Sequence, residues 1–516
     1  MGGWWSEVGG RKPRRWSLVA SRRGLAIAML ASLAMGLLPL HRVPSARACA
    51  FVDPPLTYET TEDRRLYMQA MELAGFNLLF PKDPFFSQLS IGVGARESRV
   101  SSPDVYVPPT LLKAISWIES SSSQGAADLP FGAIGPALVS FDCGYGISQV
   151  TSGMTVPIGE NNQPTDEQAL VATHFAYNIG RGTAILIDKW NAAPDARPIA
   201  GIDTNSDPHI VENWYYAVWS YNGFTGPGAN RSNHPMDPVY GAWPRTPYSC
   251  GPQSDGLGHD RSRYPYQELV YGCAAHPPMV KAPDSVAAAS VEPDVAAAAA
   301  SPTGVASPTA PTGNHPTPVA KPVAPSSSSL TLPLWQPMEA TLPDLNNPYW
   351  RAPLDLQNFQ YPYSKMDMPT PKPQHADPTA RPNDLLRALV LGAPVLAVDR
   401  PIVLVNVRPG QSATPADVTI SNVGTGLIPW RVTSNKTWIK VSTQAGVAVG
   451  KDLPCKPNAP CVRTATLKIS VDPSKVLGSD AAIVHIQGLG PNGKAADVAV
   501  FIRINVAVGV PGTTRN

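Results

Sequence analysis

The chain has 516 residues, which is long enough for two or three domains that each bury a core of their own. Its formal net charge is +2, charged residues make up 16%, and no basic run interleaved with aromatic residues occurs after the N-terminus. This composition argues against nucleic acid as a partner. Proline is unusually frequent, with 57 residues concentrated in the middle of the chain, where a packed core would not tolerate so many missing N–H donors.

The first fifty residues have the layout of an export signal. Residues 11–23 carry six arginine and lysine side chains, residues 24–40 are apolar, and small residues follow at 46–50. A signal peptidase requires small side chains before its cut, so cleavage is expected after Ala48 or after Ala50, which places the mature N-terminus near Cys49 or Phe51. The sequence therefore predicts a secreted or cell-envelope protein, periplasmic or extracellular.

Several export routes are compatible with this signal. Residues 21–23 (Ser-Arg-Arg) resemble a twin-arginine signal, but the aromatic residue and lysine that usually complete one are missing, so we favour Sec export. Lipidation of Cys49 is disfavoured, because residues 46 and 47 (Ala-Arg) replace the small and branched apolar residues expected there. An uncleaved membrane anchor is a further alternative, since the apolar stretch is nearly long enough to span a bilayer.

Six cysteines suit an oxidising compartment. They are Cys49, Cys143, Cys250, Cys273, Cys455 and Cys461. The last two are close enough to close one loop, the two before them could close another, and the first two are left over, but spacing alone does not prove a pairing. No Cys-x-x-Cys pair or histidine cluster occurs, so neither a metal site nor a cofactor is predicted.

Composition divides the chain after the signal into three parts. Residues 51–275 mix helical periodicity with glycine and proline, which predicts a globular, mainly α domain. Residues 276–390 are rich in Pro, Ala, Ser and Thr, which predicts a linker with extended backbone, although aromatic residues from Trp335 to Tyr363 would also suit a segment lying along a domain surface. Residues 391–510 contain six β-branched runs between turn residues, which predicts a β-sandwich.

One acidic residue stands at the end of a predicted helix. Two prolines at 108 and 109 suit a helix start, and Leu111, Ile115 and Ile118 recur at helical spacing, which places Glu119 at the C-terminal end of an amphipathic helix. The polar residues 120–125 are expected to open this helix end towards solvent or a cleft. A glutamate in such a position is by itself more often simply solvated.

Four short motifs follow one another between residues 108 and 228. They are Ile-Ser-Trp-Ile-Glu-Ser at 115–120, Gly-Tyr-Gly-Ile-Ser-Gln-Val at 144–150, Asn-Ile-Gly-Arg-Gly-Thr-Ala-Ile-Leu at 178–186 and Ala-Val-Trp-Ser-Tyr-Asn-Gly at 217–223. In this order they resemble the catalytic-glutamate, Gly-Leu-Met-Gln, Asn-Ile-x-x-Gly-x-x-x-Leu and Ala-Ala-Tyr-Asn-Ala-Gly segments of soluble lytic transglycosylases and goose-type lysozymes. Each motif is weakly specific, but four in the right order are hard to obtain by chance.

The resemblance implies a lysozyme-like helical fold whose cleft binds peptidoglycan strands of alternating N-acetylmuramic acid and N-acetylglucosamine. It implies Glu119 as the catalytic acid/base and Ser120, Gln149, Tyr221 and Asn222 as substrate-binding residues. Breaking a glycosidic bond requires protonation of the leaving oxygen, so a carboxylic acid that stays protonated near neutral pH suits the reaction. In the plainer interpretation, Gln149 caps a loop and residues 221–223 are an ordinary helix end.

The family's transglycosylases use no second carboxylate. There the muramoyl N-acetyl group is thought to assist, and the same glutamate then activates the sugar's own hydroxyl to leave anhydro-muramoyl ends. Asp128 or Asp142 could instead supply the second carboxylate of a lysozyme-type muramidase, although aspartates in such loops are more often caps or turn formers. We favour transglycosylation over hydrolysis.

Two features depart from the family pattern. Ser148 stands where methionine is usual, and residues 126–143 lengthen the connection after Glu119, which is expected to reshape one subsite. Four tryptophans could stack on sugar rings, but at helical spacing tryptophan is more often a core residue, so none is assigned to the site. These tryptophans are Trp190, Trp214, Trp219 and Trp243.

The last part of the chain carries a second resemblance. Asn-Val-Gly at 422–424, Trp430 and Trp-Ile-Lys-Val-Ser at 438–442 resemble the immunoglobulin-like BACON domain, and the resemblance covers residues 394–508. That family is associated with carbohydrate or glycoprotein contact and has no catalytic set. Trp430 and Trp438 are expected in the core, which favours a tethering or spacing role, with a surface glycan or glycoprotein as partner.

The sequence thus predicts an exported peptidoglycan lytic transglycosylase without a cofactor. A muramidase and a non-catalytic glycan-binding protein are the alternatives. The intact Glu119 favours an enzyme, because a pure binding protein would have no need of an acid at this position. Peptidoglycan glycan strands are the expected partner, and the sequence leaves the oligomeric state undetermined.

Overall fold

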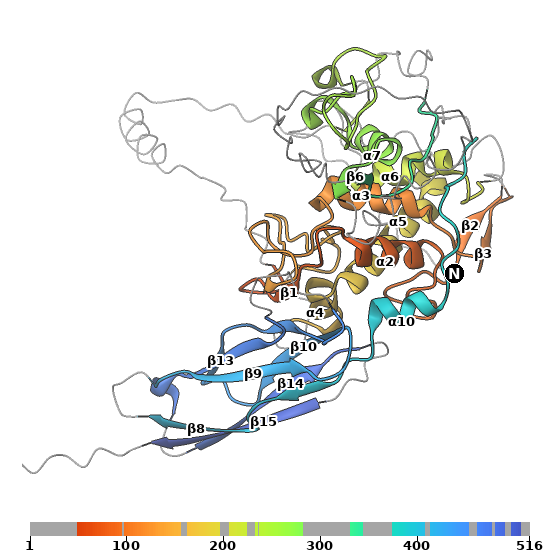
Figure 1. Cartoon of the computed structure of the whole chain (residues 1–516). Helices are drawn as coiled ribbons and strands as arrows, with labels where there is room; N and C mark the ends of the chain where they lie inside the picture. The colour runs from red at the N-terminus through yellow and green to blue at the C-terminus, as the bar shows by residue number, and fades with distance from the viewer. Residues whose placement is uncertain are drawn as a thin grey trace, which may run out of the picture. The chain divides into compact units, whose positions relative to one another are not determined.

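The computed structural model describes most of the chain between Cys49 and Val506 (Figure 1). The described ranges are 49–94, 98–155, 163–196, 206–223, 233–235, 237–281, 331–343, 374–407, 413–453, 462–476, 480–490 and 497–506. The predicted export signal before residue 49, the Cys455–Cys461 pair and most of the proline-rich segment lie outside them. None of the helices in the described ranges is long and apolar enough to cross a membrane.

Residues 49–281 contain short helices joined by long irregular segments. The α-helices are α2 (Arg65–Gly75), α3 (Pro109–Ser120), α4 (Asp166–Thr173), α5 (Phe175–Ala196), α6 (Tyr215–Tyr221) and α7 (Tyr266–Ala275). The 3-10 helices are η3 (Val211–Trp214), η4 (Pro238–Tyr240) and η5 (Arg261–Arg263). Helix α3 packs on α7 and α2, and α5 packs on α6 and α2, so the element that carries Glu119 lies among other helices (Figure 1).

The predicted fold class, a multidomain chain with a mainly α lysozyme-like domain, is wrong. Only α5, with 22 residues, exceeds 12 residues among the described helices, and short strands pair within the same part of the chain. These pairs are β1 (Leu56–Tyr58) with β4 (Ile134–Pro136), β2 (Ile91–Val93) with β3 (Val100–Ser102), and β5 (Met279–Lys281) with β6 (Thr331–Pro333). Helices α3, α4 and α6 end at the cap residues Ser121, His174 and Asn222. The irregular segments between helices are stable because buried side chains, such as those of Glu59 and Asn178, bond their backbone N–H groups.

Residues 396–506 form a five-stranded and a four-stranded sheet. The first has the order β12-β10-β14-β15-β8, and the second β11-β13-β9-β7. The strands are β7 (Leu396–Val398), β8 (Ile402–Val407), β9 (Ala416–Asn422), β10 (Leu427–Ser434), β11 (Ile439–Val441), β12 (Ala445–Val449), β13 (Ala465–Val471), β14 (Asp480–Gly488) and β15 (Asp497–Val506), with η8 (Pro473–Lys475) between β13 and β14. Pairing is antiparallel except between β15 and β8.

The two sheets share one hydrophobic core. Residues alternate between buried and more exposed along β13 and β14, as expected for strands with one face on a core. Trp430 is fully buried and Trp438 is 5% exposed, so both are core residues as the sequence predicted. The six predicted runs correspond to β8, β9, β10, β13, β14 and β15. The sequence missed β7, β11 and β12, which are three to five residues long and too short to show alternation.

Two described pieces of the proline-rich part pack against residues 49–281. The buried carboxylate of Glu212 accepts hydrogen bonds from the backbone N–H groups of Thr341 (3.0 Å) and His375 (3.1 Å). Asp377 accepts from the backbone N–H of Thr110 (2.7 Å), so its carboxylate satisfies a free donor at the start of α3. Helix α10 (Leu385–Leu391) follows and packs on α2. These segments therefore help to fix the helix that carries Glu119.

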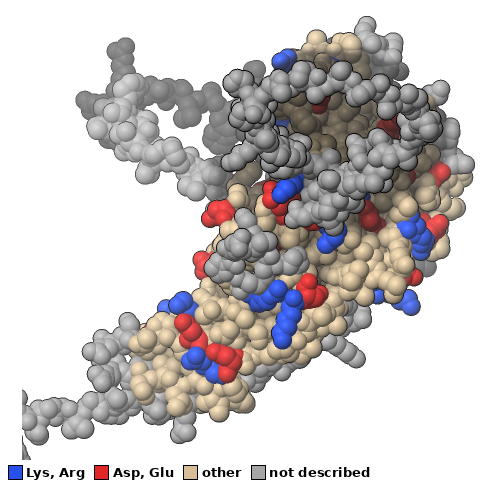
Figure 2. Space-filling model, viewed as in Figure 1, with Lys and Arg blue, Asp and Glu red and all other residues tan. Residues whose placement is uncertain are grey.

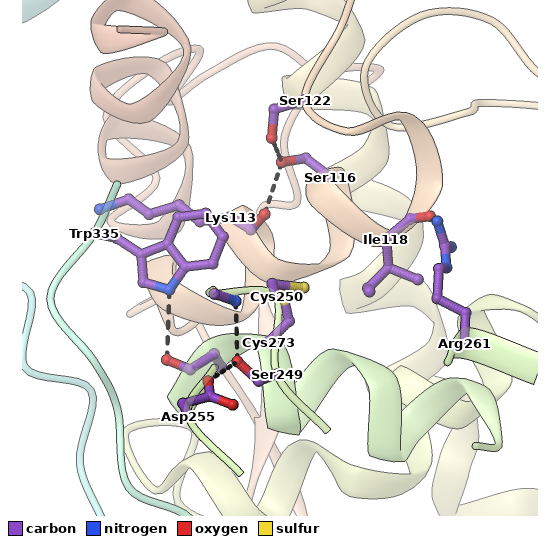
Figure 3. The surroundings of a disulfide bond; sticks show 12 residues. Lys113, Ser116, Ile118, Ser122, Ser249, Cys250, Asp255, Arg261, Cys273 and Trp335 are labelled. Atoms are coloured by element: carbon purple, nitrogen blue, oxygen red, sulfur yellow. Dashed lines mark hydrogen bonds between the residues drawn. A yellow bond between two sulfur atoms is a disulfide. The ribbon is translucent and has the colours of Figure 1, made fainter. Parts of the chain in front are cut away.

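Two disulfides join distant parts of the chain. Cys250 bonds to Cys273, as the spacing suggested, and ties the segment before η5 to α7 (Figure 3). Cys49 bonds to Cys143, the two cysteines that spacing had left over. The sequence separations are 23 and 94 residues. None of the described cysteines is free.

Removing the longer-range disulfide should cost more stability than removing the other. A Cys49→Ala/Cys143→Ala variant should lose roughly 1 kcal/mol more free energy of unfolding than Cys250→Ala/Cys273→Ala, because the larger loop restricts the unfolded chain more. Cys143 and Cys273 are both fully buried, so the two variants create comparable cavities. Urea unfolding followed by circular dichroism measures the difference. An equal or reversed loss would show that native contacts, not chain entropy, dominate.

Candidate functional site

Glu119 lies in the last turn of α3. Proline at the first helical position and the buried residues Leu111, Ile115 and Ile118 fix this helix against the core, as the sequence predicted. The residue after the helix, Ser121, has a left-handed φ of 55°, and its N–H donates to the carbonyls of Ser116 and Trp117. Glu119 is partly exposed on the side of the helix that faces a cleft.

The residues after α3 do not form the open polar loop that the sequence suggested. Ser122 and Gln124 are fully buried. The carboxylate of Glu59, which is also buried, accepts hydrogen bonds from the backbone N–H groups of Gln124 (2.9 Å) and Gly125 (2.8 Å). The loop turns inwards because buried side chains supply the partners that its backbone would otherwise find in water.

Two buried amides hold the loop of the second motif, residues 144–150. Gln124 Oε1 accepts from the N–H of Ile147 (3.1 Å), and Asn178 Oδ1 accepts from the N–H of Ser148 (2.8 Å). Gly146 lies between the two amides with φ 65°, and a Cβ there would be 2.5 Å from Gln124 Oε1 and 2.7 Å from Asn178 Nδ2. Only glycine fits this position, which gives a physical reason for the glycine of this motif.

All four sequence motifs meet at Ile147 and Ser148. From the first motif, the Ser120 hydroxyl donates to the carbonyl of Ile147 (2.7 Å). From the third, Asn178 accepts from the N–H of Ser148, and from the fourth, the Tyr221 hydroxyl donates to the Ser148 carbonyl (2.9 Å). Residues up to 101 positions apart in the sequence (120 and 221) are thereby held around one short stretch of backbone.

Glu119 lines a cleft with a volume of about 1010 Å³. This volume lies at the upper end of the range of about 300–1,000 Å³ for ligand pockets. Its lining includes both acidic and basic side chains, Asp142, Asp237 and Arg261 among them. On the face shown in Figure 2, basic and acidic residues are likewise interspersed, and neither sign dominates.

The environment of Glu119 suits proton transfer near neutral pH. Burial raises the pKa of its carboxyl group to about 7. A hydrogen bond from the Tyr266 hydroxyl to Glu119 Oε1 (2.5 Å) and the positive charge of Arg261 oppose this rise, while the negative charge of Asp142 adds to it. The carboxyl group therefore has both protonated and ionised forms available at neutral pH.

Three of the four predicted substrate-binding residues line the cleft, and the fourth does not. Gln149, Tyr221 and Asn222 line the cleft with Glu119. Gln149 adopts φ 46° and its Nε2 donates to the Gly146 carbonyl (2.8 Å), whereas Asn222 is exposed at the end of α6. Ser120 does not line the cleft, because its hydroxyl is engaged with backbone carbonyls.

Of the two aspartates considered as a second carboxylate, only one is in the cleft. Asp142 lines it and accepts a hydrogen bond from the Ser140 hydroxyl (2.5 Å), whereas Asp128 does not line it. Trp190, Trp214 and Trp219 are fully buried, in agreement with the interpretation that these tryptophans are core residues.

Sequence reasoning missed the residues that contact the end of α3 from downstream. Tyr266 opens α7, and Arg261 lies in η5, where its guanidinium donates to the carbonyl of Ile118. The Cys250–Cys273 disulfide holds the start of this segment to the far end of α7 (Figure 3). No spacing rule links Tyr266 to a glutamate 147 positions earlier, and the two cysteines that bracket the segment were the only available signal.

The described residues include no group of three or more His, Cys, Asp or Glu side chains placed to hold a metal ion. The cleft presents carboxyl, hydroxyl and guanidinium groups, which can transfer protons and form hydrogen bonds.

Comparisons with known proteins do not identify a family. No family model matches the chain, and no curated protein matches it. Among the solved structures that match in part, a Bacteroides ovatus GH5 xyloglucanase in complex with a XXXG heptasaccharide is 14% identical over 22% of this chain and 19% of that chain, with a TM-score of 0.16.

Two other solved structures show the same limited similarity. The E. coli chaperone DraB is 10% identical over 22% of this chain and 54% of that chain, with a TM-score of 0.17. A C. elegans MSP family member is 14% identical over 22% of this chain and 98% of that chain, with a TM-score of 0.16. TM-scores this low carry no argument about the fold or the function of the whole chain.

Glu119 should titrate near pH 7, and Tyr266→Phe should raise its pKa further, because the variant loses a hydrogen bond that stabilises the carboxylate. Carbon-13 NMR of carboxyl-labelled glutamate measures both values. Tyr264→Phe is the matched control, since Tyr264 also lines the cleft but donates to the carbonyl of Thr246. Titration of Glu119 near its ordinary value of 4.5 would contradict the assignment.

The same shift makes stability depend on pH. Because the folded-state pKa lies above the ordinary value, the contribution of Glu119 to folding is fully present below pH 4.5 and is lost as the pH rises through about 7. Glu119→Gln cannot ionise and should therefore be more stable than the unchanged protein at pH 8, with a smaller difference at pH 5. Thermal unfolding at the two pH values measures this, and a difference independent of pH would argue against it.

Proposed function

We propose that this protein is an exported enzyme that cleaves the glycan strands of peptidoglycan by lytic transglycosylation, with Glu119 as its single catalytic acid/base. The observation that carries the proposal is a carboxyl group whose pKa lies near 7 at the wall of a cleft large enough for an oligosaccharide. A group that is half protonated near neutral pH serves equally well as a proton donor and, one step later, as a proton acceptor.

The proposed reaction uses that property in two steps. Glu119 first donates its proton to the glycosidic oxygen, and the bond between this oxygen and the muramoyl C1 breaks with oxocarbenium-like character at C1. The resulting carboxylate then accepts the proton of the muramoyl C6 hydroxyl as that oxygen bonds to C1. The proton is returned to Glu119, no water is consumed, and the product carries an anhydro-muramoyl end.

The neighbours of Glu119 have defined parts in this scheme. The Tyr266 hydroxyl occupies Oε1, which leaves Oε2 for the proton that is transferred. The same hydrogen bond keeps the pKa of Glu119 from rising further. Glu119 can therefore donate its proton in the first step and remain as a carboxylate until the second. Gln149, Tyr221 and Asn222 line the cleft, and we assign them contacts to the substrate.

The resemblance of the four motifs to soluble lytic transglycosylases supports the same reaction. These motifs are far apart in the sequence, and their contacts at Ile147 and Ser148 give them a common role in shaping one wall of the cleft. A protein that only binds glycans would require the wall and not the acid. The enzyme is therefore preferred to a non-catalytic glycan-binding protein.

One observation favours hydrolysis as a second candidate. Asp142 lines the same cleft and its charge raises the pKa of Glu119, so a second carboxylate is available to activate a water molecule. A muramidase that uses Glu119 and Asp142 would leave reducing ends. The two candidates thus differ in product and in their need for Asp142.

Export agrees with the covalent structure. Disulfides such as Cys49–Cys143 and Cys250–Cys273 form and persist in oxidising compartments. The first of them requires that the signal be cut after Ala48, because a cut after Ala50 would remove Cys49 from the exported chain. We propose that the N-terminal signal directs the chain to the cell envelope or beyond it. For the strand region, residues 396–506, we propose a spacing or tethering role, because the two tryptophans of its BACON-like pattern, Trp430 and Trp438, are buried and not available to a sugar.

Purified peptidoglycan treated with the full exported protein should release fragments with anhydro-muramoyl ends, as identified by mass spectrometry. Glu119→Gln should reduce the rate by at least about a hundredfold, because general acid catalysis contributes about 10²–10⁴-fold. Leu89→Gln is a control on an exposed side chain outside the cleft and should leave the rate unchanged. Release that is unaffected by Glu119→Gln would refute the assignment of the acid.

Asp142→Asn separates the two candidate reactions. Under transglycosylation it should preserve the anhydro product and lower the pH at which activity declines, since the variant loses a negative charge that raises the pKa of Glu119. Under hydrolysis it should abolish product, and the unchanged protein should yield reducing ends. Asp128→Asn is the matched control, because Asp128 does not line the cleft.

A further inference from the structure

The loop of residues 139–144 is closed tightly at the edge of the cleft. The N–H of Ser140 donates to the Gly144 carbonyl (2.9 Å), and the N–H of Gly144 donates to Ser140 Oγ (2.8 Å). Cys143 adopts φ 67° and is bonded through its sulfur to Cys49. The tip of the loop, Phe141, is therefore held from both sides by hydrogen bonds and by a disulfide.

Phe141 is 83% exposed. Single exposed apolar residues are common on protein surfaces, so exposure alone implies nothing. Among the described exposed large apolar residues, Phe141 and Val239 line the same cleft as Glu119, and of these two Phe141 has the aromatic ring. Exposed large apolar residues such as Leu89 and Phe501 do not line this cleft.

We propose that Phe141 binds the substrate by acting as an aromatic platform on which one N-acetylhexosamine ring of the glycan strand stacks. This inference rests on the proposed function and specifies how its cleft holds the substrate. A pyranose ring presents a face of C–H groups, and stacking it on a phenyl ring removes apolar surface of both from water. Because the loop is already fixed, little conformational entropy is lost when the ring binds.

The proposed platform lies in a segment that is longer than in the family it resembles. Phe141 lies within residues 126–143, the lengthened connection that departs from the lytic transglycosylase pattern. The added chain returns to the cleft through the bridge between Val139 and Tyr145 and is anchored by Cys143. We therefore infer that the insertion adds a sugar contact at the rim of the cleft.

Binding to uncrosslinked glycan strands, made of alternating N-acetylmuramic acid and N-acetylglucosamine, tests the platform. The full chain carrying Glu119→Gln binds strands without cutting them, and Phe141→Ala, Phe141→Trp or Phe501→Ala is added to it. Phe141→Ala should weaken binding by about tenfold, as expected from losing part of the apolar burial of a phenylalanine. Phe141→Trp should retain binding. Phe501→Ala, which removes an exposed phenylalanine on β15, should change nothing.

Steady-state kinetics of the protein with Glu119 intact provide a second test. Phe141→Ala should raise KM by about tenfold at constant kcat, because a platform that holds ground state and transition state alike contributes only uniform binding. Equal affinity and equal KM for Phe141→Ala and Phe501→Ala, while the strands are bound and cut, would overturn the platform and leave the proposed function standing. Absence of binding by Glu119→Gln together with absence of cleavage by the unchanged protein would overturn both.

Discussion

The arrangement of the cleft depends on two buried amides, Gln124 and Asn178, that close around Gly146. Their side chains supply the hydrogen bonds that the backbone of residues 144–148 would lack in a dry interior, and an unpaired group there would cost about 1–3 kcal/mol. This stretch then offers its carbonyl groups to Ser120 and Tyr221. The position of Glu119 relative to the opposite wall follows from a backbone segment that is fully satisfied and cannot shift without breaking several bonds at once.

The electrostatics of Glu119 are a balance and not a single effect. Burial alone would favour the neutral acid, and the nearby Asp142 acts in the same direction. The Tyr266 hydroxyl and the charge of Arg261 favour the carboxylate, and both residues lie in the loop that the Cys250–Cys273 disulfide closes. The proton affinity of the candidate acid is thus set by residues from two distant parts of the chain, around residue 142 and around residues 261–266. In the same way, the start of α3 is capped by Asp377, which lies within the proline-rich part of the chain.

Local patterns predicted local structure well in this chain. The helix ending near Glu119 and six of the strands follow from proline placement, helical spacing and β-branched runs. The prediction of a mainly α domain failed because periodicity within residues 51–275 was extended across glycine- and proline-rich stretches that form irregular segments and two-stranded sheets. The open loop after Glu119 failed for a related reason. Serine and glutamine residues in a sequence usually predict a solvent-exposed loop. Here the loop is buried, because the carboxylate of Glu59 accepts hydrogen bonds from its backbone N–H groups.

The sequence by itself determined that a glutamate ends an amphipathic helix, that three motifs after it belong with it, and that Gln149, Tyr221 and Asn222 are candidates to share its site. Only the tertiary structure decided that Ser120 supports the wall and does not line the cleft, that Cys49 pairs with Cys143, and that Tyr266 and Arg261 act on the acid. The physical reason is the range of the interactions. Helix and strand patterns are written in neighbouring residues, whereas a pKa, a disulfide partner and a cleft depend on which side chains packing brings together across the whole chain.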